Sequence, residues 1–427
     1  MNIKKIVLFL FIIVISLCIT SCRGNNLTKE DKQSKTTILT SDIVSKINKE
    51  YIDEDFINWI IKNYNVDINY FNDYLSKNEY DDLIFHKLTG YSLRVLTDNY
   101  NNLYENKNNI AFIDDTNEIL FVGDVSLADN WFIMKEYDKT KNIESILSRD
   151  IISMMNSSFT VVNNEFTISN RGTKMPNKMY TFRASKDRLK LYEEMGVNLV
   201  TLANNHVYDY GIDAFNDTLD YLEEYNIPYI GAGRNLEEAK KIYYFIINGY
   251  KVAFVNATRA EKNILTPGAS DNSGGVLRCY DTTIFKEVIK EAKENSDYVI
   301  ALVHYGKESS HKLEDVQTKS SYEYIDSGAD VIVGTHAHVL QGIEFYKNKP
   351  IIYNLGNFMF NCEKVDTGIF KIVLNDDGTM DYYFIPALQE NNHTKLVSGS
   401  DKIRIINDMN AFSVNAYIDK NNKIGEK

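Results

Sequence analysis

Short apolar runs of strand length alternate with helical patterns between residues 118 and 357. The helical patterns of apolar spacing lie at 186–195, 212–225 and 284–294. Alternating strands and helices are typical of α/β proteins with largely parallel sheets. We therefore expect an α/β fold whose strands include the apolar runs 119–122, 159–162, 197–202, 251–255, 298–303, 331–333 and 350–353.

Residues 38–110 carry a different pattern, which predicts an accessory helical region ahead of the α/β domain. Acidic residues at 53–55 precede Phe56, Trp59 and Ile60, whose spacing is that of an amphipathic helix. His86 lies in an apolar run, and a packed or surface histidine is the expected role there. We place the α/β domain at 118–390 and a C-terminal extension at 391–427.

The first residues have the features of a bacterial lipoprotein signal. Two lysines precede an apolar core over residues 6–17, and small residues stand immediately before Cys22. The core is too short for a convincing membrane-spanning helix. We expect a signal peptide at 1–21, two acyl chains on Cys22, a polar tether at 22–37, and an extracytoplasmic protein anchored to the membrane by lipid. The alternative is an ordinary signal peptide with an incidental cysteine.

The charge balance excludes one class of partner. Lys and Arg total 47 against 59 Asp and Glu, for a net charge of −12. Nucleic-acid binding depends on clustered Lys and Arg, so we expect no nucleic-acid partner. Cys279 and Cys362 lack a CxxC neighbour, which argues against cysteine-based zinc binding.

Side chains of the kinds that bind metals follow the apolar runs. In open α/β sheets, ligands bind beyond the carboxyl ends of the strands. Imidazole and carboxylate groups without thiolates suit Zn, Mn or Fe, and two such ions roughly 3.5–4 Å apart support hydrolytic chemistry. We expect one or two divalent ions at this edge. The residues just past a predicted strand, which include four of the seven histidines, are Asp124, Glu165, Asn205, His206, His304, His336 and His338.

Each of these residues has a simpler explanation when taken singly. Asp124 could merely end a strand in a turn, Glu165 could be a surface charge, and Asn205 could be a turn residue. His336 and His338 would face opposite ways in an extended segment, although a tight loop would let them serve adjacent metals. The combination at equivalent positions favours a polar or metal site. His311 and His393, which follow no predicted strand, are expected at the surface.

Ordered motifs run from about 118 to 390 and resemble one known family. They are Phe-Val-Gly-Asp at 121–124, Val-Asn-Asn-Glu at 162–165, Tyr-Thr-Phe-Arg-Ala at 180–184, the segment 201–211 around Asn204-Asn205-His206, Gly-Ala-Gly-Arg-Asn at 231–235, Val-His-Tyr-Gly-Lys-Glu at 303–308, the segment 334–341 around His336-Ala337-His338, and 350–358 ending in Leu-Gly-Asn-Phe. This order resembles the CapA-type poly-γ-glutamate capsule synthesis proteins, whose fold is related to the calcineurin-like metallophosphoesterases. The resemblance implies a four-layer α/β/β/α sandwich of metallophosphatase type.

The resemblance also implies roles for the metal-binding side chains. Asp124 and His338 would hold one metal, and Glu165 would bridge to a second. That second metal would be held by Asn205, His304 and His336. The phosphoesterase pattern has Asp-x-His in its first motif, whereas Ser126 stands where that histidine would be. A single-metal site or a different reaction is therefore an open alternative.

Four further residues take roles from the same resemblance. His206 would act as a general acid near the metals, and Asp209 would orient it. Arg183 and Arg234 would bind an anionic substrate. The glycines at 231 and 233 lack the rest of a dinucleotide fingerprint, so we expect no such cofactor.

The function implied is work on poly-γ-glutamate or a related envelope polymer, in its synthesis, export or anchoring. We expect a metal-dependent hydrolase or transferase site acting on an anionic envelope polymer or its precursor. The alternative is a non-catalytic scaffold that binds polymer within the envelope machinery. In either case the lipid anchor would attach the protein to the membrane, and other capsule-synthesis membrane proteins would be its partners.

Overall fold

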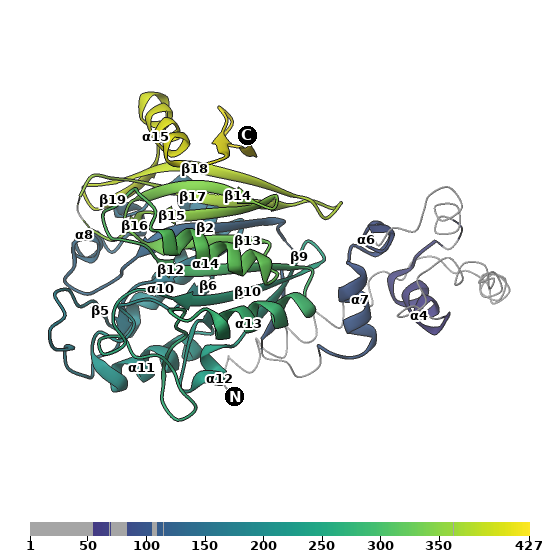
Figure 1. The fold of residues 1–427 in the computed structure, drawn as a ribbon, viewed down its shortest axis with the longest axis horizontal. Helices are drawn as coiled ribbons and strands as arrows, with labels where there is room; N and C mark the ends of the chain where they lie inside the picture. The colour runs from purple at the N-terminus through teal and green to yellow at the C-terminus, as the bar shows by residue number, and fades with distance from the viewer. Residues whose placement is uncertain (1–53, 68, 70–82, 105–108, 114, 362) are drawn as a thin grey trace. The chain divides into compact units, whose positions relative to one another are not determined.

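The computed structural model describes residues 54–67, 69, 83–104, 109–113, 115–361 and 363–427 (Figure 1). The predicted signal peptide, tether and lipidated Cys22 lie outside these residues. Across the described part of the chain, no helix combines the length and apolar character needed to span a bilayer. The chain divides into two compact units, Met1–Ile84 and Phe85–Lys427.

Helix α4 (Glu54–Tyr64) is the main described element of the first unit. It buries Phe56, Ile57 and Ile60 and leaves Lys62 on its exposed side. The apolar positions recur at helical spacing, as the sequence predicts. Helix α6 (Leu83–Thr89) follows it in the chain.

A seven-stranded sheet forms one half of the second unit. Its central strands β10, β12, β13 and β15 run parallel to one another, while β9 and β14 pair antiparallel with β10 and β15. The parallel centre confirms the α/β expectation for this part of the chain. In sheet order the strands are β1 (Ile110–Ile113), β9 (Tyr243–Ile247), β10 (Tyr250–Thr258), β12 (Tyr298–Tyr305), β13 (Val331–His336), β15 (Lys349–Leu355) and β14 (Leu340–Tyr346).

An eight-stranded sheet forms the other half. Strands β2, β3, β6 and β7 are parallel, and a long antiparallel hairpin continues the sheet beyond β2. The sequence analysis did not predict this hairpin, although Asp377-Gly378 between two alternating segments is a hairpin signal. In sheet order the strands are β19 (His393–Leu396), β18 (Met380–Glu390), β17 (Val365–Leu374), β2 (Glu118–Val125), β3 (Phe159–Asn164), β6 (Val197–Thr201) and β7 (Tyr229–Ile230), with β16 (Asn357–Met359) paired to β2.

A shared hydrophobic core joins the two sheets. The ring of Phe159 on β3 lies 4.5 Å from that of Phe245 on β9 and 5.3 Å from that of Phe254 on β10. Alternation along β2 explains this packing, because Phe121 points into the shared core while Leu120 belongs to a second core on the opposite face. The two sheets therefore depend on one another for their burial.

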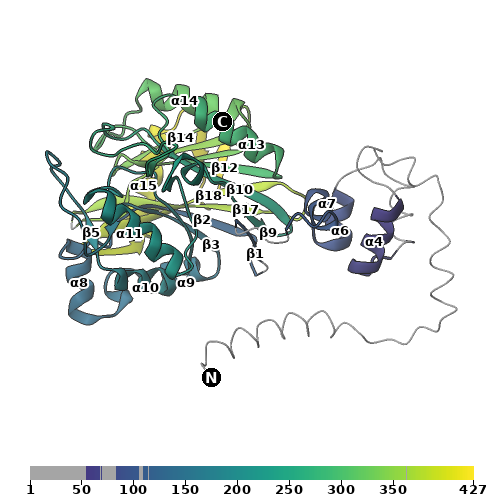
Figure 2. The ribbon, with the colours of Figure 1, turned by 90° about the horizontal axis from the view of Figure 1, so that it is seen from below.

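Helices cover the outer face of each sheet (Figure 2). Helices α9 (Arg149–Asn156), α10 (Lys190–Glu194) and α11 (Gly211–Glu224) pack on the eight-stranded sheet, and α13 (Thr283–Glu294) and α14 (Asp315–Asp326) on the seven-stranded sheet. The remaining described elements are α7 (Leu93–Tyr100), α8 (Phe132–Thr140), η1 (Ile143–Ser145), η2 (Lys186–Leu189), α12 (Leu236–Ala239), α15 (Gly399–Phe412), β4 (Thr167–Ile168), β5 (Arg183–Ala184), β8 (Ala232–Gly233), β11 (Gly275–Val276), β20 (Ala416–Ile418) and β21 (Ile424–Glu426).

Helix α7 belongs with the sheets, although the sequence groups it with the accessory region at 38–110. Lys251 on β10 places its Nζ 2.7 Å from Oδ2 of Asp98, and Ser92 donates to Asp297 over 2.7 Å. His86 is buried, bonds the carbonyl of Asn248 and stacks on a tyrosine ring. Of the expected packed or surface roles for His86, the structure shows the packed one.

The aromatic packing between the sheets predicts a large cost for truncation. Phe254 is fully buried against three phenylalanine rings, so Phe254→Ala removes packing and leaves a cavity. We expect the free energy of unfolding, measured by urea denaturation, to fall by about 3–5 kcal/mol. Ile264→Ala, at a side chain 77% exposed, is the control and changes it by about 0.5 kcal/mol or less. A similar small change in both variants would contradict this packing.

Candidate metal centre

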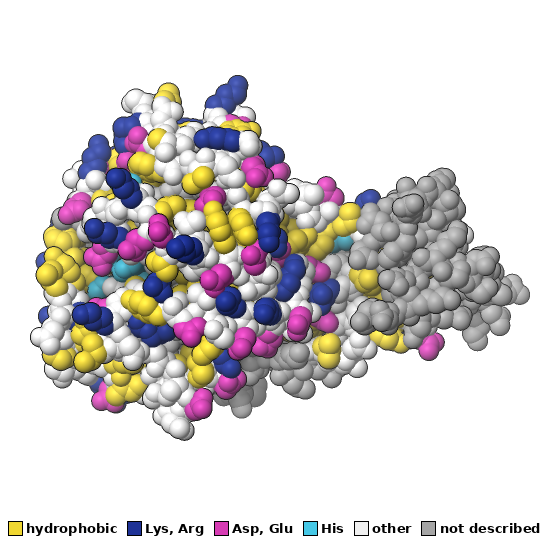
Figure 3. Space-filling view, viewed as in Figure 1, with side chains coloured by type: hydrophobic (Ala, Val, Ile, Leu, Met, Phe, Trp, Pro, Cys, Tyr) yellow, Lys and Arg dark blue, Asp and Glu magenta, His cyan; other side chains and the backbone are white. Residues whose placement is uncertain are grey.

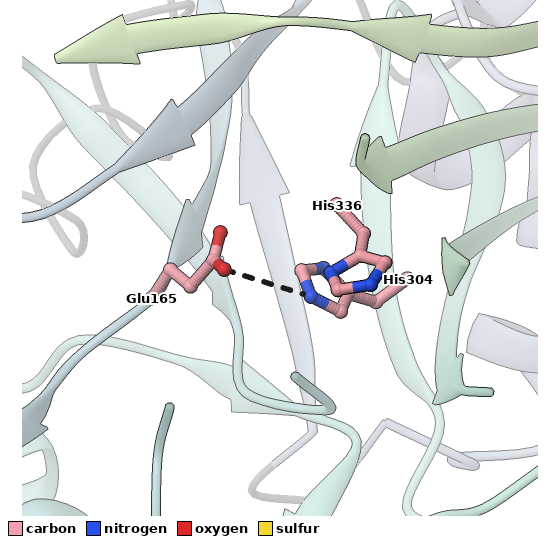
Figure 4. A group of neighbouring side chains, drawn as sticks. All are labelled: Glu165, His304 and His336. Carbon is pink, nitrogen blue, oxygen red and sulfur yellow. Dashed lines mark ion pairs between the residues drawn. The ribbon is translucent and has the colours of Figure 1, made fainter. Parts of the chain in front are cut away.

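The carboxyl ends of strands from both sheets meet at one buried site. Asp124 lies near the end of β2, and Glu165 directly follows β3. His304 lies near the end of β12, and His336 is the last residue of β13. Figure 4 shows the Glu165 carboxylate pointing toward the imidazoles of His304 and His336. The structure thus brings together the side chains that the strand ends predict.

The Glu165 carboxylate is the centre of this cluster. Its Oε1 atom lies 3.7 Å from Nε2 of His304, 3.8 Å from Nε2 of His338 and 4.0 Å from Nε2 of His206. Within the described part of the chain this oxygen accepts no hydrogen bond, and the residue is fully buried. Burial, reinforced by the charge of Asp124, raises the pKa of Glu165 well above its ordinary value.

These distances fit a divalent cation. Ligand atoms about 2.0–2.2 Å from a metal stand roughly 3–4 Å from one another, which is the spacing found around Glu165 Oε1. A buried carboxylate oxygen without a hydrogen bond costs free energy that a bound cation would offset. The donor set therefore fits the metal that the sequence predicts.

Three overlapping groups of side chains have the spacing of metal ligands. Their candidate ligand atoms all lie within 4.8 Å of one another in each group. Two groups share Glu165, as a bridging carboxylate would require, and the third adds Glu308, which the sequence analysis did not single out as a ligand. The groups are Glu165–His304–His336, Asp124–Glu165–His338 and Glu308–His336–His338.

A turn with unusual backbone angles orients His336 and His338. Their φ angles are +99° and +58°, in a region that side-chain-bearing residues rarely adopt. Their ring centroids lie 6.0 Å apart, and the His336 ring lies 4.6 Å from that of His304. The loop therefore avoids the opposite orientation of an extended segment. Strain of this kind is common where a site holds side chains in place.

Burial and hydrogen bonding shift the pKa values of the candidate ligands in opposite directions. Burial lowers the pKa of His304 well below its ordinary value and that of His336 to about 3, so both rings are neutral and have lone pairs for a metal. Burial also acts against ionisation of His338 and Asp124. The contact between Nδ1 of His338 and Oδ2 of Asp124, at 3.2 Å, outweighs it, raising the pKa of His338 and lowering that of Asp124.

Two asparagines complete the inner part of the site. Oδ1 of Asn205 lies 2.8 Å from Nε2 of His304. Asn163, which the sequence analysis did not select, donates to Asp124 over 2.9 Å and to Glu165 over 3.1 Å. It orients both carboxylates. Its place in the motif Val-Asn-Asn-Glu, two residues before Glu165, is the signal that could have identified it.

The predicted pair of His206 and Asp209 is formed. Nδ1 of His206 lies 2.8 Å from Oδ2 of Asp209, and the same oxygen accepts the backbone N–H of Phe182 over 2.6 Å. The ring of Phe182 lies 4.5 Å from the imidazole. These contacts direct Nε2 of His206 toward the cluster.

The two predicted anion-binding arginines have different surroundings. The guanidinium of Arg183 stacks over Tyr210 at 4.1 Å. Arg234 instead contacts three carboxylates, and its role in substrate binding stays a prediction that these pairs do not favour. The partners are Asp220 at 2.6 Å, Glu223 at 2.8 Å and Glu238 at 3.3 Å.

The remaining residues from the sequence analysis are Ser126 and two histidines outside the cluster, His311 and His393. The hydroxyl of Ser126 is fully buried and makes no hydrogen bond within the described residues. His311 is exposed, as expected, and stacks on Phe412, while His393 is partly exposed on β19. Histidine side chains also reach the surface on the face drawn in Figure 3.

A mixed α/β fold with a buried cluster of His, Glu, Asp and Asn side chains defines a candidate metalloprotein. The family model "Bacterial capsule synthesis protein PGA_cap" matches residues 118–362, more than half of the chain. The chain belongs to this family, which confirms the CapA-type resemblance.

Curated relatives agree with this assignment. The chain is 33% identical to the capsule biosynthesis protein CapA of Bacillus anthracis, over 52% of this chain and 55% of that protein. It is 31% identical to the PGA biosynthesis protein CapA of Bacillus subtilis (strain 168), over 63% of this chain and 70% of that protein. The chain thus spans about half the length of the first relative.

A solved structure shows a weaker likeness. The protein TT1561 of Thermus thermophilus aligns with a TM-score of 0.34 and 7% identity, over 62% of this chain and 97% of that chain.

The unpaired oxygen of Glu165 predicts the effect of an isosteric change. Glu165→Gln keeps the shape but removes the negative charge shared by two ligand groups. We expect the purified protein to take up about one or two Mn or Zn ions per chain, and the variant to retain fewer, as measured by elemental analysis after dialysis. His393→Ala, outside the cluster, should keep the wild-type content. Equal metal content in wild type and Glu165→Gln would refute this ligand assignment.

Proposed function

We propose that this protein is a metal-dependent hydrolase or transferase. The observation that carries the proposal is the buried Oε1 atom of Glu165, which faces three imidazole nitrogens at 3.7–4.0 Å without a hydrogen bond in the described residues. A purely structural cluster would satisfy such an oxygen with a donor. In a metal site, by contrast, such an oxygen makes no hydrogen bond because it is available to bind the cation.

One or two divalent ions would be held by the ligands at the strand ends. A bound cation supplies Lewis acidity and lowers the pKa of a water molecule. The supporting residues are Asp124, Glu165, Asn205, His304, His336 and His338, with Glu308 at the exposed edge.

The chain's own acid is His206. In its protonated form, Nδ1 donates to Asp209 and Nε2 carries the proton that passes to a departing oxygen or nitrogen. Asp209 stabilises the charged imidazole and fixes its orientation. The ring of Phe182, which lies tilted against the imidazole, limits its rotation.

The same proposal includes a four-layer α/β/β/α sandwich of metallophosphatase type for the domain at 118–390. Support comes from the shared core of the two sheets and from the helices on their outer faces. Residues 391–427 then form a C-terminal extension that contributes β19 and α15.

The biological process is poly-γ-glutamate capsule synthesis or work on a related envelope polymer. Support comes from the family match and from relatives named for capsule and PGA biosynthesis. The substrate would be a phosphoester or an amide of an anionic polymer or its precursor. We further propose that Cys22 is lipidated, that the protein is extracytoplasmic, and that other capsule-synthesis membrane proteins are its partners.

A non-catalytic scaffold is the second candidate. Ser126 stands where the phosphoesterase pattern has a metal-binding histidine, so the first metal position has fewer ligands. Such a protein would bind polymer without turning over a substrate.

Hydrolysis of bis(4-nitrophenyl) phosphate in the presence of Mn distinguishes the two candidates. A positioned acid contributes about 10²–10⁴-fold to rate, so His206→Ala should lower kcat by about 10-fold or more, less than the full factor because 4-nitrophenolate leaves readily. Metal content should not change. His311→Ala is the matched control with wild-type turnover. A metal-loaded wild-type protein without turnover of any phosphodiester or polymer amide would favour the scaffold.

A further inference from the structure

Lys178 is a buried cation beside the proposed acid. Its side chain is only 3% exposed, and its Nζ lies 2.6 Å from Oδ1 of Asp209 and 2.8 Å from Oε2 of Glu261. The same ammonium donates to the backbone carbonyl of Asn205. Its neighbours in the chain, Met179 and Tyr180, are 87% and 58% exposed. The lysine therefore reaches inward from a segment that is otherwise at the surface.

Burying an ammonium group is unfavourable unless opposite charges and acceptors compensate for the lost water. Here two carboxylates and a carbonyl do so. Asp209 is itself fully buried and uses its other oxygen for His206 and the backbone of Phe182. Lys178 thus supplies a buried counter-charge to Asp209.

The contacts of Lys178 lead to two parts of the site. Through Asp209 it acts on His206, the proposed acid. Through the carbonyl of Asn205 it acts on a candidate metal ligand, whose backbone also accepts the hydroxyl of Thr266 over 3.0 Å. The same hydroxyl lies 2.6 Å from Oε2 of Glu261, so its single proton is shared between the two oxygens. The Asn205 carbonyl, the Thr266 hydroxyl and the Glu261 carboxylate therefore form a ring of contacts with the ammonium.

We propose that Lys178 is a positioning residue for His206. The inference rests on the proposed function, because it gives the acid of that reaction its orientation. Without Lys178, Asp209 would be a buried carboxylate lacking its main counter-charge. Asp209 would then turn away from His206, and Nδ1 of the imidazole would lose the acceptor that fixes its orientation and tautomer.

Leaving-group dependence separates an oriented acid from a merely structural lysine. A good leaving group such as 4-nitrophenolate departs with little protonation, whereas phenolate requires more. For Lys178→Met, we expect kcat on a phenyl phosphodiester to fall by about 10–100-fold, which is typical for loss of a supporting contact. The fall on the 4-nitrophenyl analogue should be several times smaller, with KM and metal content unchanged. Lys178→Arg should restore part of the lost rate, and Lys174→Met, in the same exposed segment, should behave as wild type.

Other results overturn the inference. An equal fall on both substrates, or a loss of metal in parallel with activity, would mean that Lys178 only supports the fold. If Lys178→Met does not fold, the double variant Lys178→Met, Glu261→Met removes one charge of each sign and should show the same selective loss.

A readout without turnover keeps this inference distinct from the proposed function. If the wild type hydrolyses neither substrate, the proposed function fails, and ¹⁵N NMR of the histidine rings decides the positioning. The wild type should have the His206 proton on Nδ1, and Lys178→Met should shift it toward Nε2. An unchanged tautomer in a folded variant would refute the role of Lys178.

Discussion

The burial of one carboxylate among imidazoles constrains the whole site. Glu165 has no exposed surface, and its Oε1 atom faces His304, His338 and His206 without a hydrogen bond in the described residues. An isolated charge in such a place is strongly unfavourable. A cation that binds between these groups would remove this cost.

Close approaches between backbone segments bring the metal-binding side chains together. A Cβ on Gly123 would lie 1.9 Å from the carbonyl oxygen of Gly356, and the backbone N–H of Asp124 donates to that same oxygen over 2.9 Å. Glycine at 123 therefore allows the β15–β16 turn to lie against β2. This contact places Asp124 beside His338, which bonds Asn357 from the same turn.

A second layer of charge surrounds the proposed acid. His206 bonds Asp209, Asp209 pairs with Lys178, and Lys178 also pairs with Glu261. The charges of Asp209, Lys178 and Glu261 alternate in sign along this chain of contacts, so each compensates its neighbour. Two surface segments, which contain Lys178 and Glu261, thereby become part of the site.

The sequence by itself determined the parallel strands and the side chains at their carboxyl ends, because apolar runs that end in polar residues are local patterns. The pair of His206 and Asp209 was expected from the family resemblance. Only the tertiary structure decided that Asn163, Lys178 and Glu308 join the cluster and that Arg234 lies among carboxylates. The contacts of Asn163 with Asp124 and of Lys178 with Asp209 join residues far apart in the chain, and the local pattern around a polar residue does not show which distant partner it will meet.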